Sequence, residues 1–123
     1  MSGNAADGAE PEAEVVRARM RVIWTRARPA LLERLDAVDL AVTALAQGKL
    51  SDHVRAAAEH AAHRIAGTAG TFGFPRASEI ATDLEDAFRD HPDDLHLTER
   101  AKSAALALRR ELERSDTLPD EPD

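Results

Sequence analysis

Apolar residues recur every three or four positions along most of this chain, which is the spacing of one buried face of a helix. No segment alternates apolar and polar residues as a half-buried strand does. The pattern therefore predicts helices only. The predicted apolar stripes are, in chain order, Val16, Met20, Ile23 and Ala27 beside Trp24; Leu31, Leu35, Val38, Val42 and Leu45; Val54, Ala58, Ala61, Ala62, Ile65, Ala69 and Phe72; Ile80, Leu84, Ala87 and Phe88; and Ala101, Ala105, Leu108 and Leu112.

Capping and breaking residues divide these stripes into five predicted helices. The first runs over about residues 13–27, and Pro29 either opens the second helix or kinks a continuous one. Gly48 ends the second helix, and Ser51 is a natural N-cap for the third. The remaining boundaries are a corner at Gly73-Phe74-Pro75, a break around His91-Pro92 and an N-cap at Thr98.

The connections are short, so consecutive helices should be antiparallel neighbours. The expected fold is all-α: an up-and-down antiparallel four-helix bundle made by the second to fifth helices, with an additional N-terminal helix.

Charge is distributed unevenly over the 123 residues, whose formal net charge is −7. Both ends are acidic, contain no base and are poor in large apolar residues, whereas residues 15–115 carry a net charge of +1. We therefore expect disordered acidic tails at 1–13 and 116–123 around a single domain at 14–115. The net acidity argues against a nucleic-acid partner.

The absence of cysteine excludes a disulfide framework, a thiolate nucleophile and a cysteine-based zinc site. No apolar run is long enough to span a bilayer, and the N-terminus lacks the pattern of a secretory signal. These features predict a cytoplasmic protein without membrane contact, most simply a monomer.

A run of arginines in and just after the first predicted helix has two interpretations. No acid lies between Val15 and Leu32, and the arginines are Arg17, Arg19, Arg21, Arg26 and Arg28. They form either a solvated helix face or a basic strip that docks an acidic partner.

The most informative stretch surrounds His63 in the third predicted helix. At about 100° per residue, His63 lies about 200° from Ile65, the centre of the apolar stripe, and should face solvent. The residues expected on the same outward face, as a docking surface for a partner, are Ala56, Glu59, Gly67 and Gly70, with His60 to one side.

Gly67 and Gly70 need an explanation, because a glycine inside a helix costs about 1 kcal/mol relative to alanine. Their absent side chains would bare the imidazole and let the backbone of another molecule approach. The alternative is a fraying helix end, in which Gly70 and Gly73 form the cap and the turn.

An exposed neutral imidazole is a nucleophile. One ring nitrogen can accept a phosphoryl group while a hydrogen bond orients the other. The phosphoramidate formed is reactive enough to be passed on, so the group suits a carrier. Such a carrier needs little machinery, because phosphoryl transfer depends mainly on positioning and charge neutralisation.

These residues resemble the histidine-containing phosphotransfer (HPt) domain family. The family pattern has an apolar residue, a glycine, a small or hydroxyl residue and a second glycine two, four, five and ten positions after the histidine. Ile65, Gly67, Thr68 and Gly73 fit it after His63, and Leu84-Glu85 resembles the family's apolar-then-Glu/Gln pair on the next helix. The resemblance covers roughly residues 28–114.

The resemblance implies a phosphorelay carrier of bacterial two-component signalling. His63 would accept a phosphoryl group from an aspartyl phosphate and pass it to another receiver, supported by Arg64, Gly67, Thr68 and Glu85. The implied partners are receiver domains of response regulators or of a hybrid histidine kinase. The implied carrier has no cofactor of its own, and Mg²⁺ would belong to the receiver.

One position departs from the family pattern. Ala66 stands where the family usually has a lysine that helps to neutralise the phosphoryl group. Arg64 or an arginine from a neighbouring helix could replace it, or neutralisation is weaker. The departure leaves an alternative open, in which the bundle is an adaptor that binds a signalling partner without covalent chemistry.

Other constellations carry weaker signals. Glu59, His60 and His63 could share a metal on one helix face, but no further ligand is near in sequence. His60 as phosphoacceptor would have Arg64, not glycine, four residues on. A chain without a P-loop is not a recognisable ATP-dependent kinase. The acidic run of the fourth helix reads as a solvated face rather than a hydrolase site; its members are Asp83, Glu85, Asp86 and Asp90.

Overall fold

The computed structural model describes residues 2–90 and 96–119, with side chains from residue 11 onward. This part of the chain is all helical and contains no strand, as the periodicity predicts. Its elements are α1 (Ser2–Ala46), α2 (Asp52–Thr71), α3 (Pro75–Asp90) and α4 (Leu97–Arg114).

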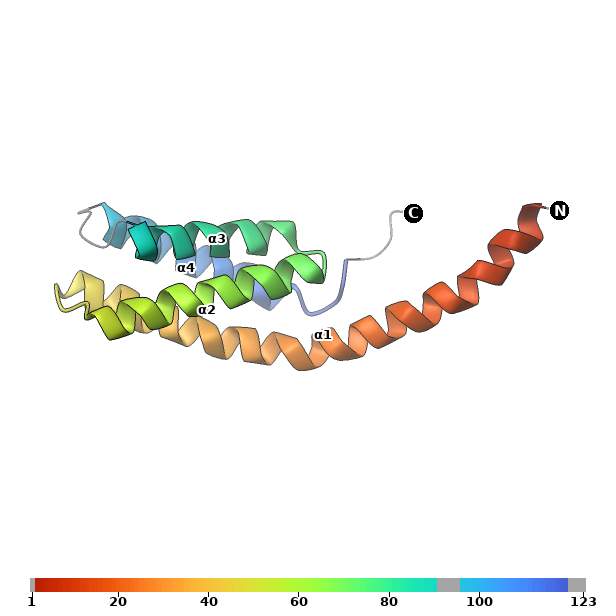
Figure 1. The fold of residues 1–123 in the computed structure, drawn as a ribbon, viewed down its shortest axis with the longest axis horizontal. Helices are drawn as coiled ribbons and strands as arrows, with labels where there is room; N and C mark the ends of the chain where they lie inside the picture. The colour runs from red at the N-terminus through yellow and green to blue at the C-terminus, as the bar shows by residue number, and fades with distance from the viewer. Residues whose placement is uncertain (1, 91–95, 120–123) are drawn as a thin grey trace.

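The four helices form an up-and-down bundle in which successive helices run antiparallel (Figure 1). The C-terminal half of α1 packs against α2 and α4, and α3 packs against the same two helices on the other side. Each helix thus contacts its two neighbours in a ring, which encloses one core.

The core combines a few large side chains with many alanines. Trp24, Phe88, Leu35 and Ile65 are at most 1% exposed. The buried face of α2 is otherwise alanine: Ala58, Ala61, Ala62, Ala66 and Ala69. Small side chains let helix backbones approach closely, so α2 can lie tightly against α3.

The additional N-terminal helix predicted from the sequence is wrong, because α1 is continuous from Ser2 to Ala46. Pro29 lies inside it and is exposed. The buried face is not interrupted there: Trp24 and Leu31, two turns apart, are 1% and 2% exposed. A proline on the solvent side bends a helix without removing its core contacts, and α1 is visibly curved (Figure 1).

The predicted orientation of the first helix is also wrong. Val16 and Ile23, expected in the core, are 59% and 51% exposed, whereas Trp24 is almost fully buried. Figure 1 shows the N-terminal part of α1 extending past the ends of the other helices. Only the face centred on Trp24 meets the bundle, and Val16 has no core to enter.

The terminal segments differ from the predicted tails. The backbone of residues 2–13 is helical as the beginning of α1, where the sequence predicts disorder. At the other end Leu118 is partly buried against the core, and residues 120–123 lie outside the described part.

The predicted caps are confirmed at two glycines and one serine. Gly48 and Gly73 have φ of +67° and +88°, which an L side chain rarely adopts. Ser51 Oγ accepts a hydrogen bond from the Val54 amide at 3.1 Å. The cap predicted at Thr98 is wrong, because α4 begins at Leu97, and the break predicted at His91-Pro92 lies outside the described residues.

None of the described helices combines the length and the apolar character needed to cross a membrane.

Candidate functional site

His63 lies on the outward face of α2, as its helical position predicts. Its side chain is 68% exposed, while Ala62 and Ile65 beside it are fully buried in the core. The imidazole is therefore open to solvent on a helix that is fixed by packing on its opposite face.

Glu85 of α3 holds the imidazole. Its Oε2 lies 3.0 Å from His63 Nδ1, and the Glu85 side chain is only 15% exposed. An ionised carboxylate can only accept a hydrogen bond, so Nδ1 carries the proton in this contact. In the neutral ring Nε2 then has the free lone pair. His63 and Glu85, each predicted from the sequence of its own helix, are thus in direct contact.

Arg89, one turn further along α3, approaches the same carboxylate. Its Nη1 lies 3.5 Å from Glu85 Oε2, its Nε lies 3.3 Å from Asp90 Oδ1, and it also pairs with Asp86. These carboxylates, Asp90 foremost, raise the pKa of Arg89 above its ordinary value. The acidic run on α3 therefore includes a cation that links Glu85 to Asp86 and Asp90.

Most of the predicted docking residues line one shallow hollow of about 430 Å³. Its walls are Ala56, Glu59, His60, His63 and Glu85. Arg55 Nη1 donates to Glu59 Oε1 at 2.9 Å and to the Phe88 carbonyl at 3.2 Å, which ties this side of α2 to the end of α3. The spacing that placed these side chains on one face is confirmed, and α3 contributes the opposite wall.

The two helical glycines have different environments. A Cβ at Gly67 would meet nothing within 4 Å, so this position is open, as a docking surface requires. A Cβ at Gly70 would lie 3.2 Å from Ser78 Oγ of α3. That hydroxyl donates to the Ala66 carbonyl at 2.8 Å. The space at Gly70 is therefore used within the bundle, by a contact between α2 and α3, although the residue is exposed on its other side.

The remaining predicted support residues take several positions. Arg64 is exposed and forms no ion pair with any described residue. Ala66, which stands where the family usually has a lysine, is 9% exposed, and its carbonyl accepts the hydrogen bond from Ser78 of α3. Thr68 is half-buried, and its carbonyl accepts a hydrogen bond from the Phe72 amide at the end of α2.

The alternative chemistries find no support in this geometry. Among residues 11–90 and 96–119, no group of three or more His, Asp or Glu side chains could hold a metal ion. The acidic run is also divided between surfaces. Glu85 faces His63, Asp86 and Asp90 pair with Arg89, and Asp83 lies on the far side of α3.

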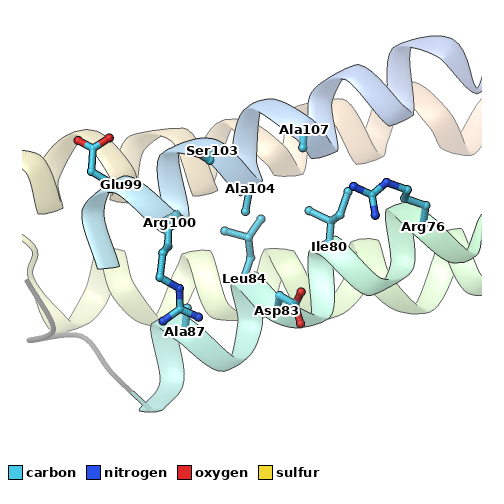
Figure 2. A pocket seen from close by; sticks show the side chains of 11 residues that line it. Arg76, Ile80, Asp83, Leu84, Ala87, Glu99, Arg100, Ser103, Ala104 and Ala107 are labelled. Carbon is cyan, nitrogen blue, oxygen red and sulfur yellow. The ribbon is translucent and has the colours of Figure 1, made fainter. Parts of the chain in front are cut away.

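That far side carries a separate groove of about 520 Å³ between α3 and α4 (Figure 2). Its floor is apolar, with Ile80, Leu84 and Ala104, and Arg76 and Arg100 stand at its edges. Its lining contains no histidine and shares no residue with that of the hollow at His63.

Three residues around the site were not predicted from the sequence: Arg55 and Ser78, which join α2 to α3, and Arg89, which pairs with carboxylates of α3. Arg89 had a detectable signal, because it stands four residues after Glu85 and three after Asp86, within ion-pair reach on a helix. The contacts of Arg55 with the Phe88 carbonyl and of Ser78 with the Ala66 carbonyl depend on the register of two helices, which no local pattern gives.

Comparisons with known proteins identify the family of this chain. The family model of the Hpt domain matches residues 23–117. The chain is also 36% identical over 62 residues to Protein RcaC of Microchaete diplosiphon, a match that spans 50% of this chain and 10% of that protein. No solved structure matches the chain significantly. The family match covers the whole bundle, including α2 with His63 and α3 with Glu85, and the chain therefore belongs to the Hpt domain family.

Proposed function

We propose that this chain carries phosphoryl groups between receiver domains, with His63 as the acceptor. Hpt domains are phosphotransfer carriers, which supports the general role. The observation that carries the assignment to this residue is the contact of an exposed imidazole, through Nδ1, with the Glu85 carboxylate at 3.0 Å.

The proposed step transfers one phosphoryl group and no proton. The Nε2 lone pair of His63 attacks the phosphorus of a receiver's aspartyl phosphate. A P–N bond forms as the P–O bond to the aspartate breaks, and the aspartate leaves as a carboxylate. Nδ1 keeps its proton, and the positive charge that develops on the ring is stabilised by Glu85. The same reaction in reverse then delivers the phosphoryl group from His63 to the aspartate of a second receiver.

Neutralisation of the phosphoryl oxygens needs a cation that Ala66 cannot supply. Arg89 is already engaged by Glu85, Asp86 and Asp90, whereas Arg64 has no ion pair among the described residues. Arg64 is therefore the better candidate on this chain, with a long side chain that can reach back along α2. We propose that the receiver brings the Mg²⁺.

Receiver domains would dock over the hollow at His63 and the open backbone at Gly67. The hollow leaves room for an approaching loop, and Gly67 lets that loop come close to α2.

The proposal is tested by incubating the protein with phosphorylated receiver domains from a panel. A carrier acquires label that acid removes and base does not, and it gives up the label to a second receiver. The alternative is an adaptor without covalent chemistry, and it would bind a receiver and acquire no label. That second outcome across the panel would contradict the proposal.

Glu85→Ala should slow phosphoryl acceptance about tenfold, because the ring loses the hydrogen bond that fixes its orientation and tautomer. Glu85→Gln keeps a side-chain oxygen that can accept from Nδ1 but loses the negative charge that stabilises the ring cation, so its rate should lie between those of Glu85→Ala and the original protein. Single-turnover transfer rates at saturating receiver measure this step apart from binding. Equal rates for Glu85→Ala and the original protein would rule out the orienting role.

Gly67→Glu should weaken receiver binding at least tenfold while leaving the fold intact, because the added side chain enters open space at the docking surface. Ala57→Glu is the matched control, since Ala57 is exposed on α2 but points away from His63. Binding is measured by titration with an unphosphorylated receiver. If both variants bind as the original does, the docking surface lies elsewhere.

A further inference from the structure

The N-terminal arm of α1, residues 11–22, has no role in the proposed transfer. It precedes the matched family region, which begins at residue 23. Three large apolar side chains of the arm are exposed: Val15, Val16 and Val22, each by 51–59%. Ile23, at the junction with the bundle, is exposed by 51%. A lone helix in water is only marginally stable, and this one presents apolar side chains to solvent.

The outward surface of the arm has the shape that receives another helix. Val15, Ala18, Arg19 and Val22 occupy positions i, i+3, i+4 and i+7, and with Ile23 they line an apolar hollow of about 450 Å³. Four residues at this spacing form the hole that accepts one side chain of a partner helix in knobs-into-holes packing. The small side chain of Ala18 leaves the centre of the hole open.

Acidic and basic residues are segregated along this part of α1. Residues 7–14 contain four acids and no base, and residues 15–28 contain five arginines and no acid. Arg28 is committed to the bundle, where it donates to the Leu112 and Glu113 carbonyls at 2.7 and 2.8 Å. Arg19 and Arg26 are exposed and form no ion pair with any described residue.

We propose that two copies of this chain pair through their arms as antiparallel helices, giving a homodimer. This proposal differs from the monomer expected from the sequence. A parallel pair would align acids with acids and arginines with arginines, which costs free energy along its length. In an antiparallel pair that crosses between Ala18 and Arg19, the acidic segment of each copy lies along residues 23–30 of the other, where Arg26 is exposed.

The apolar positions set the register of this pair. When the two arms cross between Ala18 and Arg19, Val15 of each copy faces Val22 of the other. The same register brings Glu12 of each copy close to Arg26 of the other, and both side chains are exposed in the single chain. Arg19 of each copy then lies over Ala18 of the other, where its stem can cover the valines while its guanidinium reaches solvent.

The first test is the mass in solution by sedimentation equilibrium at micromolar to submillimolar concentrations. The original chain should sediment at twice its 13.3 kDa. Val15→Glu/Val22→Glu should sediment as a monomer, with the helix content of the bundle kept. Leu40→Glu is the control, because Leu40 is 61% exposed on α1 within the bundle and should leave the dimer intact. A monomeric original chain, or a dimer unaffected by the double substitution, would overturn the proposal.

The second test separates this register from other dimers. Glu12→Arg and Arg26→Glu should each raise the dimer's dissociation constant at least tenfold, and the two together should restore it, since the charges are then exchanged. Failure of the double variant to recover would overturn the antiparallel register. Neither test uses a receiver, so its result does not depend on phosphoryl transfer by His63.

Discussion

Replacing His63 by glutamine should abolish the acid-labile phosphoryl label completely. Glutamine has no ring nitrogen and cannot form the P–N bond. Because position 63 is exposed on α2, the substitution should leave the core unchanged. The measurement is incorporation from a phosphorylated receiver, followed by acid and base treatment of the separated protein. Circular dichroism of the variant checks that the bundle is folded.

His60→Gln is the matched control for this prediction. Both histidines line the same hollow and lie three residues apart on α2. His63 contacts Glu85 and precedes the open position at Gly67, while Arg64 stands at the corresponding distance from His60. The His60 variant should retain at least half of the label. Loss of label in His60→Gln together with its persistence in His63→Gln would show that His60, and not His63, is the acceptor.

Trp24→Ala should lower the free energy of unfolding by about 3–5 kcal/mol, as expected when a large buried aromatic side chain is truncated. Trp24 is 1% exposed, and its ring centroid lies 5.1 Å from that of Phe72 and 4.7 Å from that of Phe74. Its Nε1–H donates to the Ser115 carbonyl at 2.6 Å. One side chain thus joins α1 to the α2–α3 corner and to the segment after α4.

Two further variants separate the contributions to this loss of stability. Trp24→Phe keeps an aromatic ring but leaves the Ser115 carbonyl without its donor, and should cost about 1–3 kcal/mol. Leu40→Ala removes an exposed side chain of the same helix and should change stability by less than about 0.5 kcal/mol. Urea denaturation followed by far-UV circular dichroism measures all three, since it does not depend on the tryptophan signal. A change in Trp24→Ala as small as that in Leu40→Ala would show that the N-terminal end of the bundle needs no such anchor.

Helical periodicity was sufficient to predict the bundle and the outward direction of His63. The apolar stripes from Leu31 to Leu112 are confirmed as core positions, because a bundle buries one face of each helix along its full length. The same reasoning failed for the first helix. Periodicity marks a face that is apolar, but the burial of that face depends on whether another helix lies opposite, and on the N-terminal side of Trp24 none of the described helices does.

The properties of single residues were likewise sufficient to predict the turns at the glycines, but not to predict the effect of Pro29 on the helix. Gly48 and Gly73 adopt positive φ, which is a property of a single residue. Pro29 permits either a helix start or a continuous bent helix, and the continuity of the buried face from Trp24 to Leu31 favours the second.

The sequence by itself determined the helical class, the exposure of His63 and the open backbone at Gly67, because each follows from one helix and its period of 3.6 residues. Only the tertiary structure decided that Glu85 holds Nδ1 and that Ser78 of α3 lies against Gly70. These contacts depend on how far α3 is shifted along α2 and rotated about its own axis. That register results from the packing of the whole core, so no pattern within either helix contains it.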